Sequence, residues 1–110
     1  MLIDKKGNTT IVTQEKATVT ELVQRLEQNY EHYKSDNLII NLFSLKESKT
    51  IPLAEFLRLS EKHKLGKHSL VLVNKYLPFD AIPEGLNVVP TLVEAHDLIE
   101  MEEIERDLGI

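Results

Sequence analysis

The hydrophobic pattern is strongest in the middle of the chain, where four aliphatic residues stand together without alternation: Leu38, Ile39, Ile40 and Leu42. A run of this kind, bounded by polar residues, is typical of a strand that is covered on both faces, as in parallel sheets. The polar residues 44–50 follow, and Pro52 then stands where a helix tolerates proline best, in its first turn. The pattern therefore predicts a buried strand, a polar loop and a helix whose N-terminus faces water.

Apolar residues at three- and four-residue steps predict two helices before and after this strand. The first helix covers about residues 19–34 and begins with a capping box formed by Thr18 and Glu21. Its apolar stripe comprises Val19, Leu22, Val23, Leu26, Tyr30 and Tyr33. The second helix is expected to run from Pro52 to Gly66, a plausible C-cap residue. We expect its inward side chains to be Leu53, Ala54, Phe56, Leu57 and Leu65.

A second capping box, Thr91 and Glu94, predicts a final helix near the end of the chain. The residues that can pack from this helix are Leu92, Ala95, Leu98, Ile99 and Met101. Beyond Met101 the stripe loosens, because acidic residues alternate with Ile104 and Leu108. The last turns are therefore expected to project past the sheet or to lie across a partner.

Four further strands are predicted around the buried one. Residues 2–5 and 10–13 flank a Gly-Asn turn and predict an antiparallel hairpin. Residues 69–74 form a second doubly buried run, and residues 86–90 form a short edge strand after an irregular crossover with one helical turn at residues 79–82. The expected fold is a single α/β domain, residues 1–110, of two or three layers. Its order is β-β-α-β-α-β-(α)-β-α, with a mixed, mostly parallel sheet of about five strands.

Composition narrows the class of protein. The chain is 42% hydrophobic and 28% charged, as in an ordinary soluble domain. It has no cysteine, no signal-peptide pattern and no run long enough to span a membrane, so a cytoplasmic location with no membrane partner is expected. The net charge of −5 combines a basic segment, residues 46–75, with an acidic end, residues 91–110. An acidic total argues against nucleic-acid binding, and both charged segments can serve simply as solvated faces.

Loops at the carboxyl ends of strands are where open α/β sheets bind ligands and partners. The loop after the buried strand carries Lys46, Ser48, Lys49 and Thr50 immediately before a predicted helix N-terminus. We therefore expect these four residues to form a partner-facing loop. Thr50 or Ser48 is the expected phosphorylation site, because a phosphate near a helix N-terminus and two lysines would be favourably placed.

Three segments together give the chain a resemblance to the STAS family of bacterial anti-anti-sigma-factor-like domains: NLFSL, GKHSLVLVN and EGLNVVPTLVEA. The resemblance covers nearly the whole chain and implies the STAS fold. It also implies a regulatory role through binding an anti-sigma-like or kinase-like protein. In that family the loop reads Asp-Ser-Ser-Gly-Leu-Gly and a serine is phosphorylated. Here Asn41-Leu42 matches, but Lys49, Thr50, Ile51 and Pro52 replace the acid, both serines and the glycine, and only Leu53 is retained.

A looser resemblance is to short bacterial chains with tails similar to EMEEIERDLG, some of which are catalogued as ribonuclease Z. A two-zinc phosphodiesterase needs clustered imidazoles and carboxylates, and its family pattern is His-x-His-x-Asp-His. The four histidines of this chain, His32, His63, His68 and His96, have no such spacing. We expect His63 and His68 to lie on the surface around a glycine turn, and His96 with Glu100 to be solvated. The adjacent Glu102 and Glu103 are expected to form a polar helix face.

Three function classes follow from these patterns. The favoured one is a non-enzymatic, STAS-like regulatory protein that works by protein–protein contact and uses no cofactor or metal. An enzyme, specifically a metal-dependent ribonuclease, is the alternative, although no catalytic motif supports it. The third class is a subunit of a larger assembly that uses the acidic helix around Ile104 and Leu108. A homodimer is left open.

Overall fold

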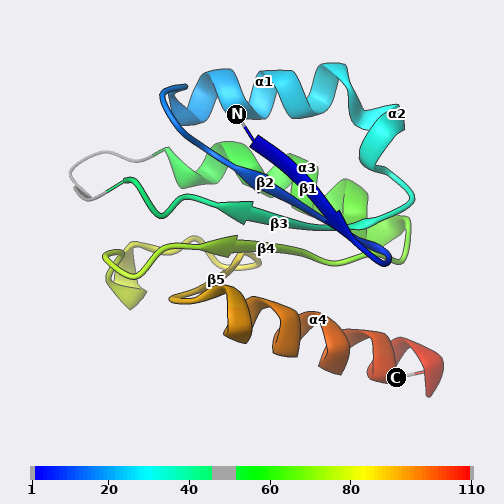
Figure 1. The fold of residues 1–110 in the computed structure, drawn as a ribbon. Helices are drawn as coiled ribbons and strands as arrows, with labels where there is room; N and C mark the ends of the chain where they lie inside the picture. The colour runs from blue at the N-terminus through cyan, green and yellow to red at the C-terminus, as the bar shows by residue number, and fades with distance from the viewer. Residues whose placement is uncertain (1, 46–51, 110) are drawn as a thin grey trace.

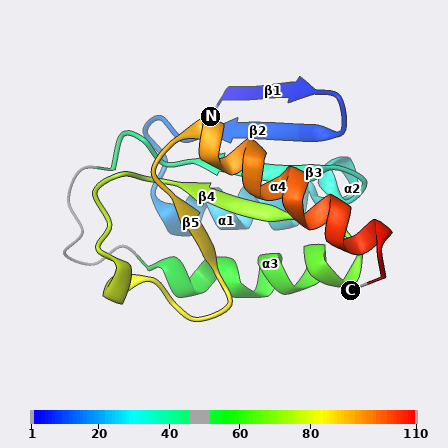
Figure 2. The same cartoon turned by 90° about the horizontal axis from the view of Figure 1, so that it is seen from below.

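The computed structural model describes residues 2–45 and 52–109 and has an α/β fold with one five-stranded sheet (Figure 1). The strands lie in the order β1-β2-β3-β4-β5. Helices α1 and α3 cover one face, and α4 crosses the other (Figure 2). The strands are β1 (Leu2–Lys6), β2 (Thr9–Thr13), β3 (Asn37–Asn41), β4 (Leu70–Val73) and β5 (Asn87–Val89). The helices are α1 (Val19–Gln28), α2 (Tyr30–Tyr33), α3 (Phe56–Leu65) and α4 (Leu92–Asp107), with short 3-10 turns at Leu53–Glu55 and Phe79–Ala81.

The sheet is mixed, and the predicted α/β class is confirmed. β1 and β2 form the expected antiparallel hairpin, in which Ile3 pairs with Val12. The other neighbours, β2 with β3, β3 with β4, and β4 with β5, all pair in parallel. The central position of β3 follows from this order, since two strands lie on either side of it. None of the helices within the described ranges is long and apolar enough to cross a membrane.

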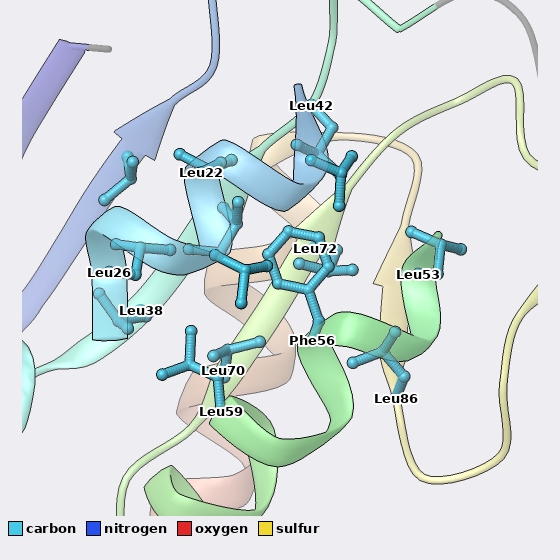
Figure 3. Close-up of a cluster of buried hydrophobic side chains, with 14 of the residues drawn as sticks. Leu22, Leu26, Leu38, Leu42, Leu53, Phe56, Leu59, Leu70, Leu72 and Leu86 are labelled. Atoms are coloured by element: carbon cyan, nitrogen blue, oxygen red, sulfur yellow. The ribbon is translucent and has the colours of Figure 1, made fainter. Parts of the chain in front are cut away.

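Strand β3 is covered on both faces, as its unbroken apolar run predicts. Leu38, Ile39 and Ile40 have no exposed surface. Leu38 and Ile40 pack with α1 and α3, whereas Ile39 packs on the opposite face with Ala95 of α4. Figure 3 shows Phe56 of α3 among leucines from α1, β3 and β4.

The first predicted helix is interrupted, and in this respect the prediction of one helix over residues 19–34 is wrong. The capping box of Thr18 and Glu21 is present and starts α1 as expected. At Asn29 the backbone leaves the helical region, and the side-chain amide of Asn29 donates to the carbonyl of Arg25. Asparagine competes for backbone hydrogen bonds in this way, which explains why α1 ends and the short α2 begins.

The helix expected from Pro52 begins later. Pro52 has φ −77° and ψ 65°, which is not helical, and it precedes a 3-10 turn. The α-helix α3 begins only at Phe56. Its buried side chains follow the i, i+3, i+4, i+7 pattern: Phe56, Leu59, Ser60 and His63. Ala54 and Leu65 do not point inward as predicted. Leu65 lies on the far side of this stripe and is 86% exposed.

Helix α4 lies on the second face of the sheet and is anchored by Ala95 and Ile99. The Thr91 side chain accepts the N–H of Glu94, as the capping pattern predicts. Leu92 and Met101 are exposed, so the prediction that they pack inward is wrong. For Met101 the physical reason is that successive helix positions turn by about 100°, which places residue 101 on the side opposite residue 99. Leu92 is the first residue of α4, almost one turn before the buried Ala95.

Removal of side-chain volume from β3 should be far more costly than the same change on β1. We expect Ile40→Ala to lower the free energy of unfolding by about 2–5 kcal/mol, because it leaves a cavity in the core. Ile3→Ala is the matched control, since Ile3 is exposed on the edge strand, and it should cost about 0.5 kcal/mol or less. Urea unfolding followed by circular dichroism measures both values, and equal losses would contradict the central position of β3.

Candidate functional site

The carboxyl ends of β3, β4 and β5 meet at one edge of the sheet, because these strands are parallel (Figure 1). A cavity of about 360 Å³ opens there. It is lined by Phe43, Val73, Asn74, Lys75, Tyr76 and Pro90. Val73 is the last residue of β4, and the other lining residues come from the loops that follow the three strands. This is the usual position of a binding site in an open α/β sheet.

Two aromatic side chains at this edge face solvent. Phe43 is 57% exposed and Tyr76 is 43% exposed. The neighbouring Leu42 fills the core, so the chain turns Phe43 outward, and the N–H of Phe43 donates to Oδ1 of Asn41. Lys75 Nζ lies 5.3 Å from the centre of the Tyr76 ring, which is close enough for a cation–π contact. We call Phe43, Lys75, Tyr76 and Pro90 the carboxyl-edge surface.

A buried amide holds the carboxyl-edge surface in place. Asn74 Nδ2 donates to the carbonyl oxygens of Leu42, at 2.9 Å, and Leu45, at 2.8 Å. Its Oδ1 accepts the N–H groups of Tyr76, at 2.8 Å, and Leu77, at 3.1 Å. One side chain therefore joins the loop after β3 to the loop after β4.

A second buried amide does the same between β2 and β3. Gln14 donates to the carbonyl of Ala17 and accepts from the hydroxyl of Ser44. The N–H of Gln14 also donates to the carbonyl of Asn41. Ser44 is thus occupied in structural hydrogen bonding to Gln14, and the loop after β3 is held from both sides.

The four residues that the sequence nominates as a partner-facing loop lie outside the described residues: Lys46, Ser48, Lys49 and Thr50. Their predicted roles, including phosphorylation of Thr50 or Ser48, stay predictions. Leu45, the last described residue before them, is bound by Asn74 at the carboxyl edge. In the sequence, the predicted partner-facing loop therefore begins next to the carboxyl-edge surface.

His63 is fully buried, so the prediction that it lies on the surface is wrong. Its Nε2 is 2.8 Å from the carbonyl of Asp36 and its Nδ1 is 2.7 Å from the hydroxyl of Tyr30. A carbonyl can only accept, so Nε2 carries the proton and Nδ1 accepts from Tyr30. Burial lowers the pKa of His63 below its usual value and raises the pKa of Tyr30. The ring is a neutral hydrogen-bonded core residue between α2 and α3.

Two carboxylates on the inner side of α4 are hydrogen-bonded to the opposite edge of the sheet. Glu103 Oε2 accepts from Asn8, at 2.7 Å, and from Asn37, at 3.2 Å. Glu102 accepts from Ser69 and Asn87. The polar helix face expected of this pair lies against the sheet, because the inner side of α4 passes over polar groups where the strands begin.

The remaining histidines do not gather into a site in the described part of the chain. His32 is exposed, whereas His68 and His96 are half-buried. No group of three or more histidine, aspartate or glutamate side chains that could hold a metal ion is found within residues 2–45 and 52–109. The chain matches no model of a known protein family, and no curated protein matches its sequence.

The sequence predicts a partner-facing loop at the carboxyl edge, but it does not predict the described residues that form the carboxyl-edge surface. Asn74 stands directly after the apolar run of β4, where a polar residue is unremarkable in the sequence. Phe43 and Tyr76 look like core residues, since aromatic side chains are usually buried. The one sequence signal for Phe43 and Tyr76 was their position, two or three residues after the end of a buried strand.

Loss of the Asn74 amide should loosen the carboxyl edge. Asn74→Ala removes four hydrogen bonds, two to carbonyl oxygens and two from N–H groups, and we expect a loss of at least about 2 kcal/mol in the free energy of unfolding. Asn87→Ala is the matched control. That half-buried amide donates to Glu102 over 3.3 Å, and its removal should cost about 1 kcal/mol or less. Chemical denaturation of both variants checks the difference, and similar losses would count against this role of Asn74.

Burial of neutral His63 should make stability depend on pH. The unfolded chain protonates this group near 6.5, before the folded chain does, so the free energy of unfolding should fall as pH drops below that value. His63→Leu should flatten this dependence while lowering stability, because Tyr30 loses its acceptor. Urea titrations between about pH 5 and pH 8 measure these slopes, and an unchanged slope in His63→Leu would refute the assignment.

Proposed function

We propose that this chain is a non-enzymatic, STAS-like regulatory protein that binds another protein through its carboxyl-edge surface. The observation that carries this proposal is the pair of exposed aromatic rings, Phe43 and Tyr76, beside a cavity of about 360 Å³. Exposed aromatic residues with an apolar body and a polar rim are characteristic of protein-binding hot spots.

The hydrogen bonds that fix the described parts of these loops support a binding role. Asn74 and Gln14 are both buried and tie the loops after β2, β3 and β4 to one another. A surface that is held in one conformation before contact loses less conformational entropy when the partner arrives. Lys75 adds a positive charge beside Tyr76, which favours a partner with acidic groups at the rim.

The STAS-like part of the proposal rests on the resemblance of the sequence and on a compatible α/β architecture. The two serine positions of that family's loop correspond here to Thr50 and Ile51, which lie outside the described ranges. Phosphorylation of Ser48 or Thr50 would reverse the charge next to Lys46 and Lys49. Such a change would lie close in sequence to Phe43, so it could control binding at the carboxyl-edge surface.

Substitution of both exposed rings tests the proposal. The double variant F43S/Y76S should fold with a loss of about 1 kcal/mol or less, because neither ring is buried. Captured proteins from the native cells are quantified by mass spectrometry for the wild type and for the variant. We expect at least one protein to be retained by the wild type and lost by F43S/Y76S.

Leu65→Ser is the matched control. It removes an exposed apolar side chain from the C-terminal end of α3, away from the carboxyl ends of the strands. The control should retain the same protein as the wild type. An identical set of captured proteins for all three baits would contradict the proposed binding surface.

A further inference from the structure

The outer side of α4 carries a row of exposed apolar side chains. Met101, Ile104 and Leu108 are 54%, 53% and 68% exposed. Their three- and four-residue spacing places them side by side along the helix, and we call these three residues the α4 stripe. The helix is anchored on the sheet by Ala95 and Ile99. Helix α4 therefore has two apolar sides, one buried and one facing solvent.

A row of exposed apolar side chains differs from a single exposed apolar residue. Single exposed apolar residues such as Leu65 are common on soluble proteins and require no explanation. Three neighbouring large side chains on one helix face form a continuous patch, and contiguous exposed patches mark interaction sites. The α4 stripe is also held in place before a partner binds, because hydrogen bonds made by Glu102, Glu103 and Arg106 fix the inner side of α4.

Acidic side chains border the α4 stripe, while Lys67 and Arg106 share a surface hollow with Ile104. Glu100, Glu105 and Asp107 flank the α4 stripe and are exposed. When Met101, Ile104 and Leu108 are assigned to the a, d and a positions of a heptad, these acids occupy the e and g positions. In paired helices those positions face the e and g positions of the partner helix and determine which partner is accepted.

We propose that the α4 stripe is a second docking surface, and that it binds an amphipathic helix of another protein whose apolar row is flanked by lysine or arginine. The α4 stripe is separate from the carboxyl-edge surface, and this proposal does not depend on that surface. The C-terminal half of α4 lies toward the end of the sheet opposite the loop that follows β3 (Figure 2). A partner helix on the α4 stripe would bury Met101, Ile104 and Leu108 and pair its basic residues with the flanking acids.

Charge complementarity distinguishes this occupant from two others. A second copy of α4 would place Glu100, Glu105 and Asp107 against the same acids in either relative direction, and like charges that face one another are destabilising. An anionic membrane would repel the same three side chains, whereas helices that lie on such membranes are rich in lysine and arginine. A basic helix is the occupant that satisfies both the apolar row and its acidic borders.

Titration calorimetry of the full chain with two designed helical peptides tests this proposal. Each peptide has about three heptads with leucine at a and d; one carries lysine and the other glutamate at e and g. We expect the lysine peptide to bind at least about tenfold more tightly than the glutamate peptide. The triple variant M101A/I104A/L108A retains good helix formers and should lose at least about tenfold in affinity for the lysine peptide.

Two matched variants sharpen the test. E100K/E105K/D107K should invert the preference, so that the glutamate peptide binds more tightly. Leu65→Ala removes an exposed apolar residue elsewhere and should leave both affinities unchanged. Equal affinity for the two peptides, or full affinity in the triple alanine variant, would overturn the proposal. Sedimentation that shows a dimer of the wild type that is lost in the triple alanine variant would also overturn it, because a second copy would then be the occupant.

Discussion

The architecture depends on covering both faces of β3. Leu38 and Ile40 need an apolar layer on one side of the sheet, and Ile39 needs another on the opposite side. Helices α1 and α3 provide the first layer, and the anchoring residues of α4 provide the second. Because β3 is central and its parallel neighbours run in the same direction, the loops that follow these strands gather at one edge. The location of the carboxyl-edge surface is thus a consequence of where the aliphatic run is buried.

Polar side chains complete each end of this apolar sandwich. At the carboxyl edge, Asn74 and Gln14 satisfy backbone groups where the strands stop pairing. At the opposite edge, Glu102 and Glu103 accept hydrogen bonds from side chains at the strand beginnings. Within residues 2–45 and 52–109, every buried side-chain nitrogen or oxygen has a hydrogen-bond partner. The two edges expose different side chains. The carboxyl edge exposes aromatic rings, whereas α4, which crosses toward the opposite edge, exposes an apolar row that is bordered by acidic residues.

The sequence was informative where a single local pattern determines the structure. The aliphatic run of β3, the hairpin between β1 and β2, and the cap at Thr18 are local features, and all were predicted. The sequence was less informative where tertiary contacts decide. His63 is polar and stands near a glycine turn, yet Tyr30 and the carbonyl of Asp36 allow it to be buried. The carboxyl-edge position of the candidate site could be predicted from topology. Asn74 could not be predicted as the residue that holds this surface, since its partners come from two loops that are distant from each other in sequence.

Hydrogen exchange of the folded protein, measured residue by residue by nuclear magnetic resonance, tests the central position of β3 most directly. If β3 is central, the amides of Ile39 and Ile40 should exchange only through global unfolding, so that their protection reports the full free energy of unfolding. The amides of the edge strand β1 that do not pair with β2 should exchange much faster. Protection of Ile39 and Ile40 no greater than that of the unpaired β1 amides would contradict the account.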